Sequence, residues 1–149
     1  MYIYRKEDLS VYYWILDMFN DVPFLTVVDS FPDQILAVPT VSIDAGKLDE
    51  EPFELGNREK IRIRRWYIDI FARNKSQRDD MGYRLMYNST NGISINNYDE
   101  GFPPAVTPSV IGHMAISANS YEPVPVILDL NEKLYYRGQV ILVTQNDTV

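Results

Sequence analysis

The 149-residue sequence contains no cysteine, which excludes disulfides, cysteine-based metal sites and thiol catalysis together. It has one histidine, His113, and a lone histidine cannot build the common histidine-rich metal sites. Phosphate-cradling glycine patterns are also absent. The acidic run 49–51 lacks the ligand spacing and turn glycine of a calcium loop. We therefore expect no enzyme, no cofactor and no metal site.

Long hydrophobic runs are missing as well. The longest, VYYWIL at 11–16, is far shorter than the ~20 residues that cross a bilayer. The first ten residues, MYIYRKEDLS, carry charges where a secretory signal needs an apolar segment. We expect a soluble protein that neither spans a membrane nor follows the classical secretory route. The length and the 46% hydrophobic content predict a single domain over 1–149.

Charge of both signs is present but unevenly placed. The net charge is −7, yet eight of the 14 basic residues fall within 58–78, against only two acidic residues there. Just upstream lies an acidic group made of Asp44, Asp49, Glu50, Glu51 and Glu54. Such asymmetry predicts patches that meet a complementary surface.

The basic residues follow the most clearly patterned strand, 61–72. Ile61 and Ile63 have one parity, whereas the apolar residues from Trp66 onward have the other. A period of two cannot place both sets on one face. We predict a β-bulge at Arg64–Arg65 that resets the phase and turns these arginines toward a neighbouring molecule.

The remaining elements predict an α+β fold. Apolar spacing indicates helices over 7–20 and about 76–89, the second capped by Asn74 with Gln77 or by Ser76. Alternation and turn residues predict further strands at 24–28, 35–43, 93–98, 113–119, 124–130 and 133–145, the last two joined by a turn at Asn131–Glu132. The polar segment 44–60 is expected to be a long connection or hairpin arm, and 99–112 a proline-rich loop. The result is a mostly antiparallel sheet with both helices packed on one face.

Three interpretations of the basic strand remain open. Arginines beside Trp66 and Tyr67 could bind nucleic acid by phosphate contacts and base stacking, although the acidic chain would repel a polyanion. The arginines could instead form the solvated face of an edge strand. They could also meet the acidic arm of another copy, in a head-to-tail contact that closes into a ring.

The runs PTVSIDAG (39–46), PFELG (52–56) and RIRRWYIDIFARNKSQRDDMGYRL (62–85) resemble the tail-terminator proteins of long-tailed bacteriophages, and more loosely the neck and tail-completion group. The closing segment VILDLNEKLYYRGQVILVT (126–144) is similar to the end of that family. The order of elements matches over nearly the whole chain, while the residue-level match is confined to about 39–85. The proline-rich loop 99–112 departs from the family.

The resemblance implies a structural virion protein that is assembled in the host cytoplasm. It would form a homo-hexameric ring that caps the tail tube and joins it to the head connector, with genome DNA passing through the lumen unbound. The alternatives are another head-to-tail component, a stopper or adaptor, and a nucleic-acid-binding accessory protein. No catalytic residues carry over. We expect the subunit interface to comprise Asp49, Glu50, Glu51, Glu54, Arg62, Arg64, Arg65 and Trp66.

Overall fold

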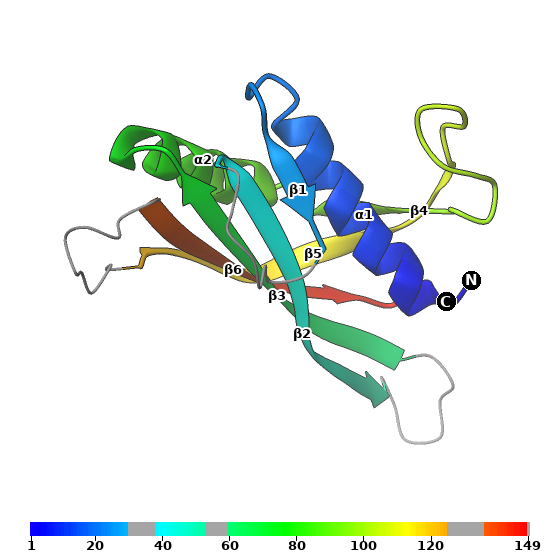
Figure 1. Ribbon diagram of the computed structural model, residues 1–149. Coiled ribbons are helices and arrows are strands. Elements are labelled where there is room, and N and C mark those ends of the chain that lie inside the picture. Colours follow the sequence, from blue (N-terminus) through cyan, green and yellow to red (C-terminus); the bar gives the residue numbers. More distant parts are fainter. Residues whose placement is uncertain (30–37, 53–59, 125–135, 149) are drawn as a thin grey trace.

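The structure, a computed structural model, describes residues 1–29, 38–52, 60–124 and 136–148 (Figure 1). The described chain forms two helices, α1 (Ile3–Met18) and α2 (Lys75–Ser89), and six strands. The strands are β1 (Thr26–Val28), β2 (Thr40–Pro52), β3 (Lys60–Ala72), β4 (Ile93–Asn96), β5 (Val110–Pro123) and β6 (Tyr136–Asn146). Neither helix is long and apolar enough to cross a bilayer within the described ranges.

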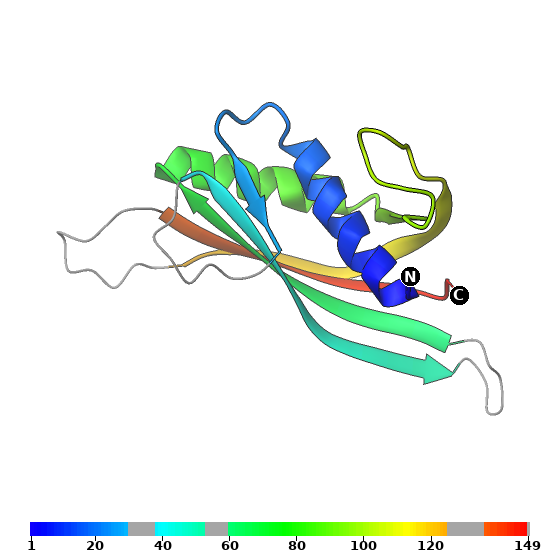
Figure 2. The ribbon, with the colours of Figure 1, turned by 45° about the vertical axis from the view of Figure 1, so that its right-hand side comes forward.

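The six strands form one curled sheet in the order β1-β2-β3-β6-β5-β4. Only the short β1 runs parallel to its neighbour; the other pairs are antiparallel. The two edges of the sheet are therefore β1 and β4. In Figures 1 and 2, helix α1 crosses the sheet between these edges, and the β2–β3 hairpin extends beyond the helices.

Both helices pack on the same face of the sheet, as predicted for the α+β fold. Val11 and Ile15 of α1, and Met81 and Leu85 of α2, belong to one buried apolar cluster. The strands contribute to it residues of single parity, including Ile68, Ile70, Val140 and Leu142. This is the period of two expected for strands covered on one face.

Helix α1 begins four residues earlier than the sequence pattern predicted. The prediction placed Glu7 and Asp8 in the first turn, where the helix dipole favours acids. In the structure Ile3 and Tyr4 start the helix, with Ile3 packed against the core. Glu7 lies further along the helix and is completely buried. Its charge is therefore stabilised by buried partners and not by the helix dipole.

The polar segment 44–60 is largely strand. β2 continues to Pro52 and pairs with β3 back to Lys60, so the described part of the expected connection is a β-hairpin. Residues 53–59 lie outside the described residues, as does the predicted turn at Asn131–Glu132. The hairpin formed by residues 44–52 of β2 and 60–65 of β3 is called the arm below.

The predicted bulge at Arg64–Arg65 is wrong. β3 pairs with β6 in unbroken register from Arg62 to Ala72. The irregularity lies across the ladder in β2, between Ala45 and Leu48, where the extra residues oppose Arg65. The parity did not need resetting, because Arg62 and Arg64 occupy the same buried face as Trp66 and Ile68.

Candidate functional site

Two of the three arginines of β3, Arg62 and Arg64, are enclosed beneath α1 and bind a carboxylate of the same chain. Arg62 donates from Nε to Glu7 Oε1 at 2.7 Å, and Arg64 donates from Nη1 to Glu7 Oε2 at 3.2 Å. Glu7 is fully buried, and each arginine is only 5% exposed. One carboxylate thus binds two guanidinium groups, which ties the first half of α1 to the arm.

The C-terminal strand joins the same cluster. Asn146 donates to Glu7 Oε1 at 3.0 Å and accepts a hydrogen bond from Arg62 at 2.8 Å. Arg62 also donates to the carbonyl oxygen of Thr148. We call Glu7, Arg62, Arg64 and Asn146 the Glu7 cluster. It holds helix α1, the arm and the end of β6 together.

Arg64 is held from several sides. It donates to the Tyr4 carbonyl at 3.0 Å, and its Nη1 lies 2.9 Å from an oxygen of Asp8. Its guanidinium carbon lies 4.3 Å from the ring centroid of Trp66, a cation–π contact. Burial raises the pKa of Asp8, an effect that Arg64 opposes. Removing one partner from such a buried set typically costs about 3–5 kcal/mol, because a charge is left without compensation.

A second contact links α1 to the arm nearer its tip. The Tyr4 hydroxyl donates to Glu50 Oε1, and Lys60 lies 3.5 Å from the other oxygen of Glu50. This hydrogen bond holds the pKa of Glu50 below its usual value and raises the pKa of Tyr4. Glu50 therefore serves a contact within the chain.

The residues predicted for the subunit interface are divided by the fold. Arg62, Arg64 and Trp66 face inward, and Trp66 donates from its indole nitrogen to Thr144 Oγ1 at 3.0 Å. Arg65 and Glu51 are exposed. Asp49 is partly exposed and lies 3.5 Å from the Lys47 ammonium. Glu54 lies outside the described residues. The acidic and basic members that remain on the surface are Glu51, Asp49 and Arg65.

The face of the sheet opposite the helices carries a strip of partly exposed apolar side chains. Cross-strand pairs align Tyr67 with Ile141 and Arg65 with Val143, and Ile61 and Ile63 continue the row along the arm. We call Ile61, Ile63, Tyr67, Ile141 and Val143 the open-face strip. A depression of about 280 Å³ lies beside it, bordered by Arg65 and Ser120. Clustered apolar surface of this kind marks interaction sites.

A larger cavity, of about 750 Å³, lies between α1, β4 and the loop 97–109. Its apolar walls are formed by Tyr13, Trp14, Tyr98, Pro103, Pro104 and Pro108. Tyr98 stacks between Tyr13 at 5.5 Å and Phe102 at 5.9 Å, measured between ring centroids. We call this cavity the aromatic groove. It lies at the β4 edge of the sheet.

The walls of the aromatic groove are fixed by polar contacts. Ser10 on α1 accepts a hydrogen bond from the Asn96 amide at 3.1 Å. Lys6 lies 2.8 Å from Asp99, which keeps the pKa of Asp99 low. The base of the loop is closed by the Asn97 amide donating to the Ser109 carbonyl at 2.8 Å. The groove is thus preformed.

The described residues assemble no metal centre. No group of three or more acidic or histidine side chains is placed to hold a metal ion there. The pKa of Tyr121 is raised to about 12 by burial and by its 2.7 Å hydrogen bond to Asp79. That contact ties β5 to α2 and supports the fold.

The Glu7 cluster and the aromatic groove were both missed by sequence reasoning. A signal for the first existed: Glu7 lies four residues before Val11 and eight before Ile15, on the apolar stripe of the helix. A charge on such a stripe requires a buried partner. The groove left no comparable pattern, because it forms from segments distant in sequence.

Comparison with known proteins does not show a family for this chain. No protein-family model matches the chain, and no curated protein matches its sequence. Among solved structures, it is similar to a chain described as "Virion of native gene transfer agent (GTA) particle". That similarity covers 93% of this chain and 92% of the other, with 12% sequence identity and a TM-score of 0.47. A similarity at this level concerns the course of the backbone alone.

Proposed function

We propose that this protein is a structural subunit of a bacteriophage virion, which forms a homo-hexameric ring at the end of the tail tube. In this proposal the ring caps the tube and joins it to the head connector, and genome DNA passes through the lumen. The protein acts by association and carries out no catalysis.

The observation that carries the proposal is the open-face strip on the arm side of the sheet. The arm extends beyond the helices, and Ile61 and Ile63 lie on its uncovered face. Such a partly exposed apolar surface is suited to contact another subunit. Strand edges and faces left uncovered in a monomer are commonly covered in an assembly. The exposed charges of Glu51 and Arg65 beside it would set the register of such a contact.

The order of elements adds support. The resemblance to tail terminators implies a first helix, strands joined by an arm, a strand leading to a second helix, and closing strands. The described chain follows this order from α1 to β6.

The burial of the arginines weakens the nucleic-acid interpretation. Phosphate contacts need accessible cations. Arg62 and Arg64 are bound to Glu7 inside the fold, so they are not available to a polyanion.

Electron microscopy of the purified protein mixed with phage tail tubes tests the proposal. We expect rings bound at one end of each tube, and growth of the tube by added tube subunits should stop there. Binding to isolated head connectors without binding to tubes would instead identify a stopper or adaptor. Failure to bind either structure would contradict the proposed role.

A further inference from the structure

We propose that the aromatic groove receives the turn around Phe24 from a second copy of this chain. The inference rests on the proposed function in one respect, because it takes self-association into a ring as given. It adds the partner of the groove and the residues that make the contact.

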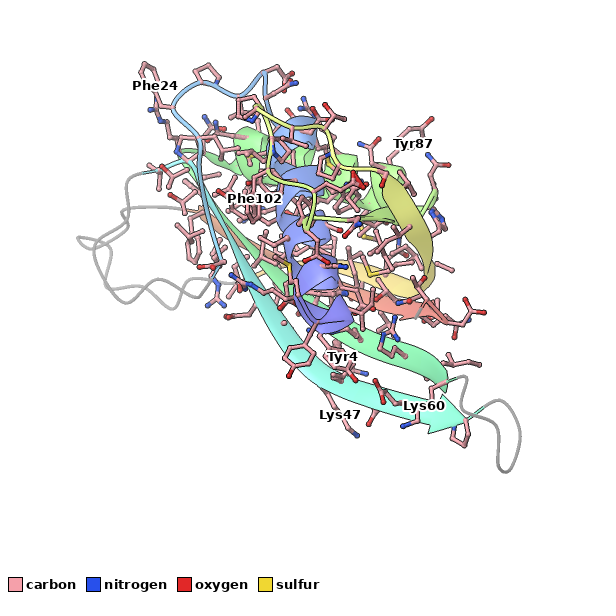
Figure 3. All side chains as sticks on the ribbon, turned by 90° about the vertical axis from the view of Figure 1, so that its right-hand side faces the viewer. Tyr4, Phe24, Lys47, Lys60, Tyr87 and Phe102 are labelled. Carbon is pink, nitrogen blue, oxygen red and sulfur yellow. The ribbon has the colours of Figure 1, made fainter. Side chains whose placement is uncertain are left out.

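Phe24 is held in an unfavourable conformation with its side chain in solvent. Its φ of 61° lies in the left-handed region, which costs a non-glycine residue about 1–2 kcal/mol. Its side chain is 82% exposed, and Figure 3 shows it pointing away from the molecule at the turn that follows α1. Strain of this kind points to a role for the residue outside the monomer.

The Phe24 turn adjoins β1 and one wall of the groove adjoins β4, the two edges of the sheet. The other wall of the groove is the end of α1, where Leu16, Asp17 and Asn20 precede the turn. The turn leads directly into β1, whereas the groove is lined by Ile93 and Ser94 of β4. In Figure 1 these two strands lie on either side of α1. A surface feature at one edge that fits a hollow at the other produces a head-to-tail contact, and repetition of that contact closes into a ring when the rotation allows.

Charge at the two sites is complementary. The guanidinium of Arg73 lies 5.8 Å from the centroid of the Phe24 ring, so a cation accompanies this side chain. Asp17 lines the groove, is exposed, and forms no ion pair within the described part of the chain. Docking the Phe24 turn would bring Arg73 toward Asp17 of the receiving copy.

The size of the groove also fits a whole turn of the chain better than a single phenylalanine ring. A cavity of about 750 Å³ exceeds the volume of a single phenylalanine side chain and has room for the exposed Pro23 as well. Among the other exposed aromatics, Tyr87 is 78% exposed but lies on the regular helix α2 without backbone strain. It serves as the matched control.

Cysteine crosslinking tests the contact directly, because the natural chain has no cysteine. Pro23→Cys combined with Thr107→Cys leaves Phe24 in place and puts one thiol on the turn and one at the groove. Mild oxidation should give a ladder of covalent oligomers on a non-reducing gel. Tyr87→Cys combined with Thr107→Cys is the control. A ladder no stronger than the control would overturn the proposal.

One further substitution, made in two backgrounds, guards against misfolding. Phe24→Asn replaces the ring with a residue that tolerates positive φ, so the fold should be retained. In the Pro23→Cys, Thr107→Cys background it should remove the ladder, and it should weaken self-association of the natural chain by about 10- to 100-fold, the effect of losing one buried phenylalanine. Unchanged self-association would count against the contact.

Charge exchange provides the second measurement. Asp17→Arg and Arg73→Asp should each reduce ring formation, and the double variant should restore it. The outcome separates this inference from the proposed function. Rings that form and bind tubes without the crosslink refute only the contact described here, whereas crosslinked ladders that never bind a tube or connector refute the tail role and leave the contact standing.

Discussion

At the scale of single residues, Glu7 explains why a cluster of arginines can sit inside an acidic protein. A fully buried carboxylate normally loses more by leaving water than it gains from one partner. Here two arginines and Asn146 surround it, so every charge in the cluster has an opposite neighbour. The arrangement makes each member dependent on the others.

Glu7→Gln should therefore destabilise the protein by about 3 kcal/mol, because Arg62 loses the carboxylate that it contacts and Arg64 keeps only Asp8 of its two. Chemical denaturation measures the change. Arg65→Gln, on the exposed face of the same strand, is the control and should change the free energy of unfolding by less than about 0.5 kcal/mol. Similar losses from both variants would show that the Glu7 cluster is not what stabilises this region.

Tyr121 gives a pH-dependent prediction. Its pKa is about 12 in the folded chain, above the 10.0 of an ordinary tyrosine. The folded state therefore holds the phenolic proton more tightly than the unfolded state does, and this contribution to stability is complete below pH 10. It should be lost as the pH rises from about 10 to 12.

Denaturation curves of the natural chain and of Tyr121→Phe across this pH range measure the effect. The difference in stability between the two should shrink as the pH rises through the window. A constant difference would mean that Tyr121 does not titrate with a raised pKa.

At the scale of elements, helix α2 shows local sequence rules at work. Asn74 accepts a hydrogen bond from the Gln77 amide at 2.8 Å, while Gln77 Oε1 accepts one from the Arg73 amide at 2.9 Å. The cap is Asn74, one of the two residues that the sequence offered; Ser76 lies inside the helix.

Asn74→Ala should lower the free energy of unfolding by about 1 kcal/mol, because the helix loses an acceptor for an amide at its first turn. Thermal or chemical unfolding measures it. Ser76→Ala is the comparison and should have a smaller effect. The reverse order would reassign the cap.

Local patterns predicted the helices and strands well. Contacts between residues far apart in the sequence could not be predicted from such patterns. The cap at Asn74, strand β4 and the placement of both helices on one face follow from spacing within short windows. The bulge at Arg64–Arg65 was wrong because charged residues were taken as exposed, although Glu7 lay 55 residues away in the sequence to bury them. The aromatic groove required the pairing of α1 with residues 92–110, which no single window contains.

At the scale of the whole molecule, the structure separates charges that serve the fold from charges left for a partner. Glu50, Arg62 and Arg64 are bound within the chain. Glu51 and Arg65 face outward on the arm. A contact between Glu51 and Arg65 of neighbouring copies remains a prediction. It involves fewer residues than the eight that the sequence analysis expected at the interface.

Arg65→Glu should reduce ring formation by about tenfold if an opposite charge on a neighbouring copy lies within reach. Adding Glu51→Arg in the same chain should recover it. Sedimentation at several protein concentrations reports both results. Arg64→Glu is unsuitable for this purpose, since it would disturb the Glu7 cluster; lost assembly in Arg65→Glu without recovery in the double variant would exclude this pairing.

Helix α1 also fixes the distance and rotation between two sites of the molecule. Glu7, near its start, is fixed to the arm, and Asp17, near its end, lines the groove. Ten residues of helix set these two sites about 15 Å apart at a fixed rotation. One alanine inserted after Tyr12 would turn the two halves by about 100° relative to each other. The chain could then keep either the contact of Glu7 with the arm or the shape of the groove, but not both. A substitution at the same position would leave the rotation between Glu7 and Asp17 unchanged.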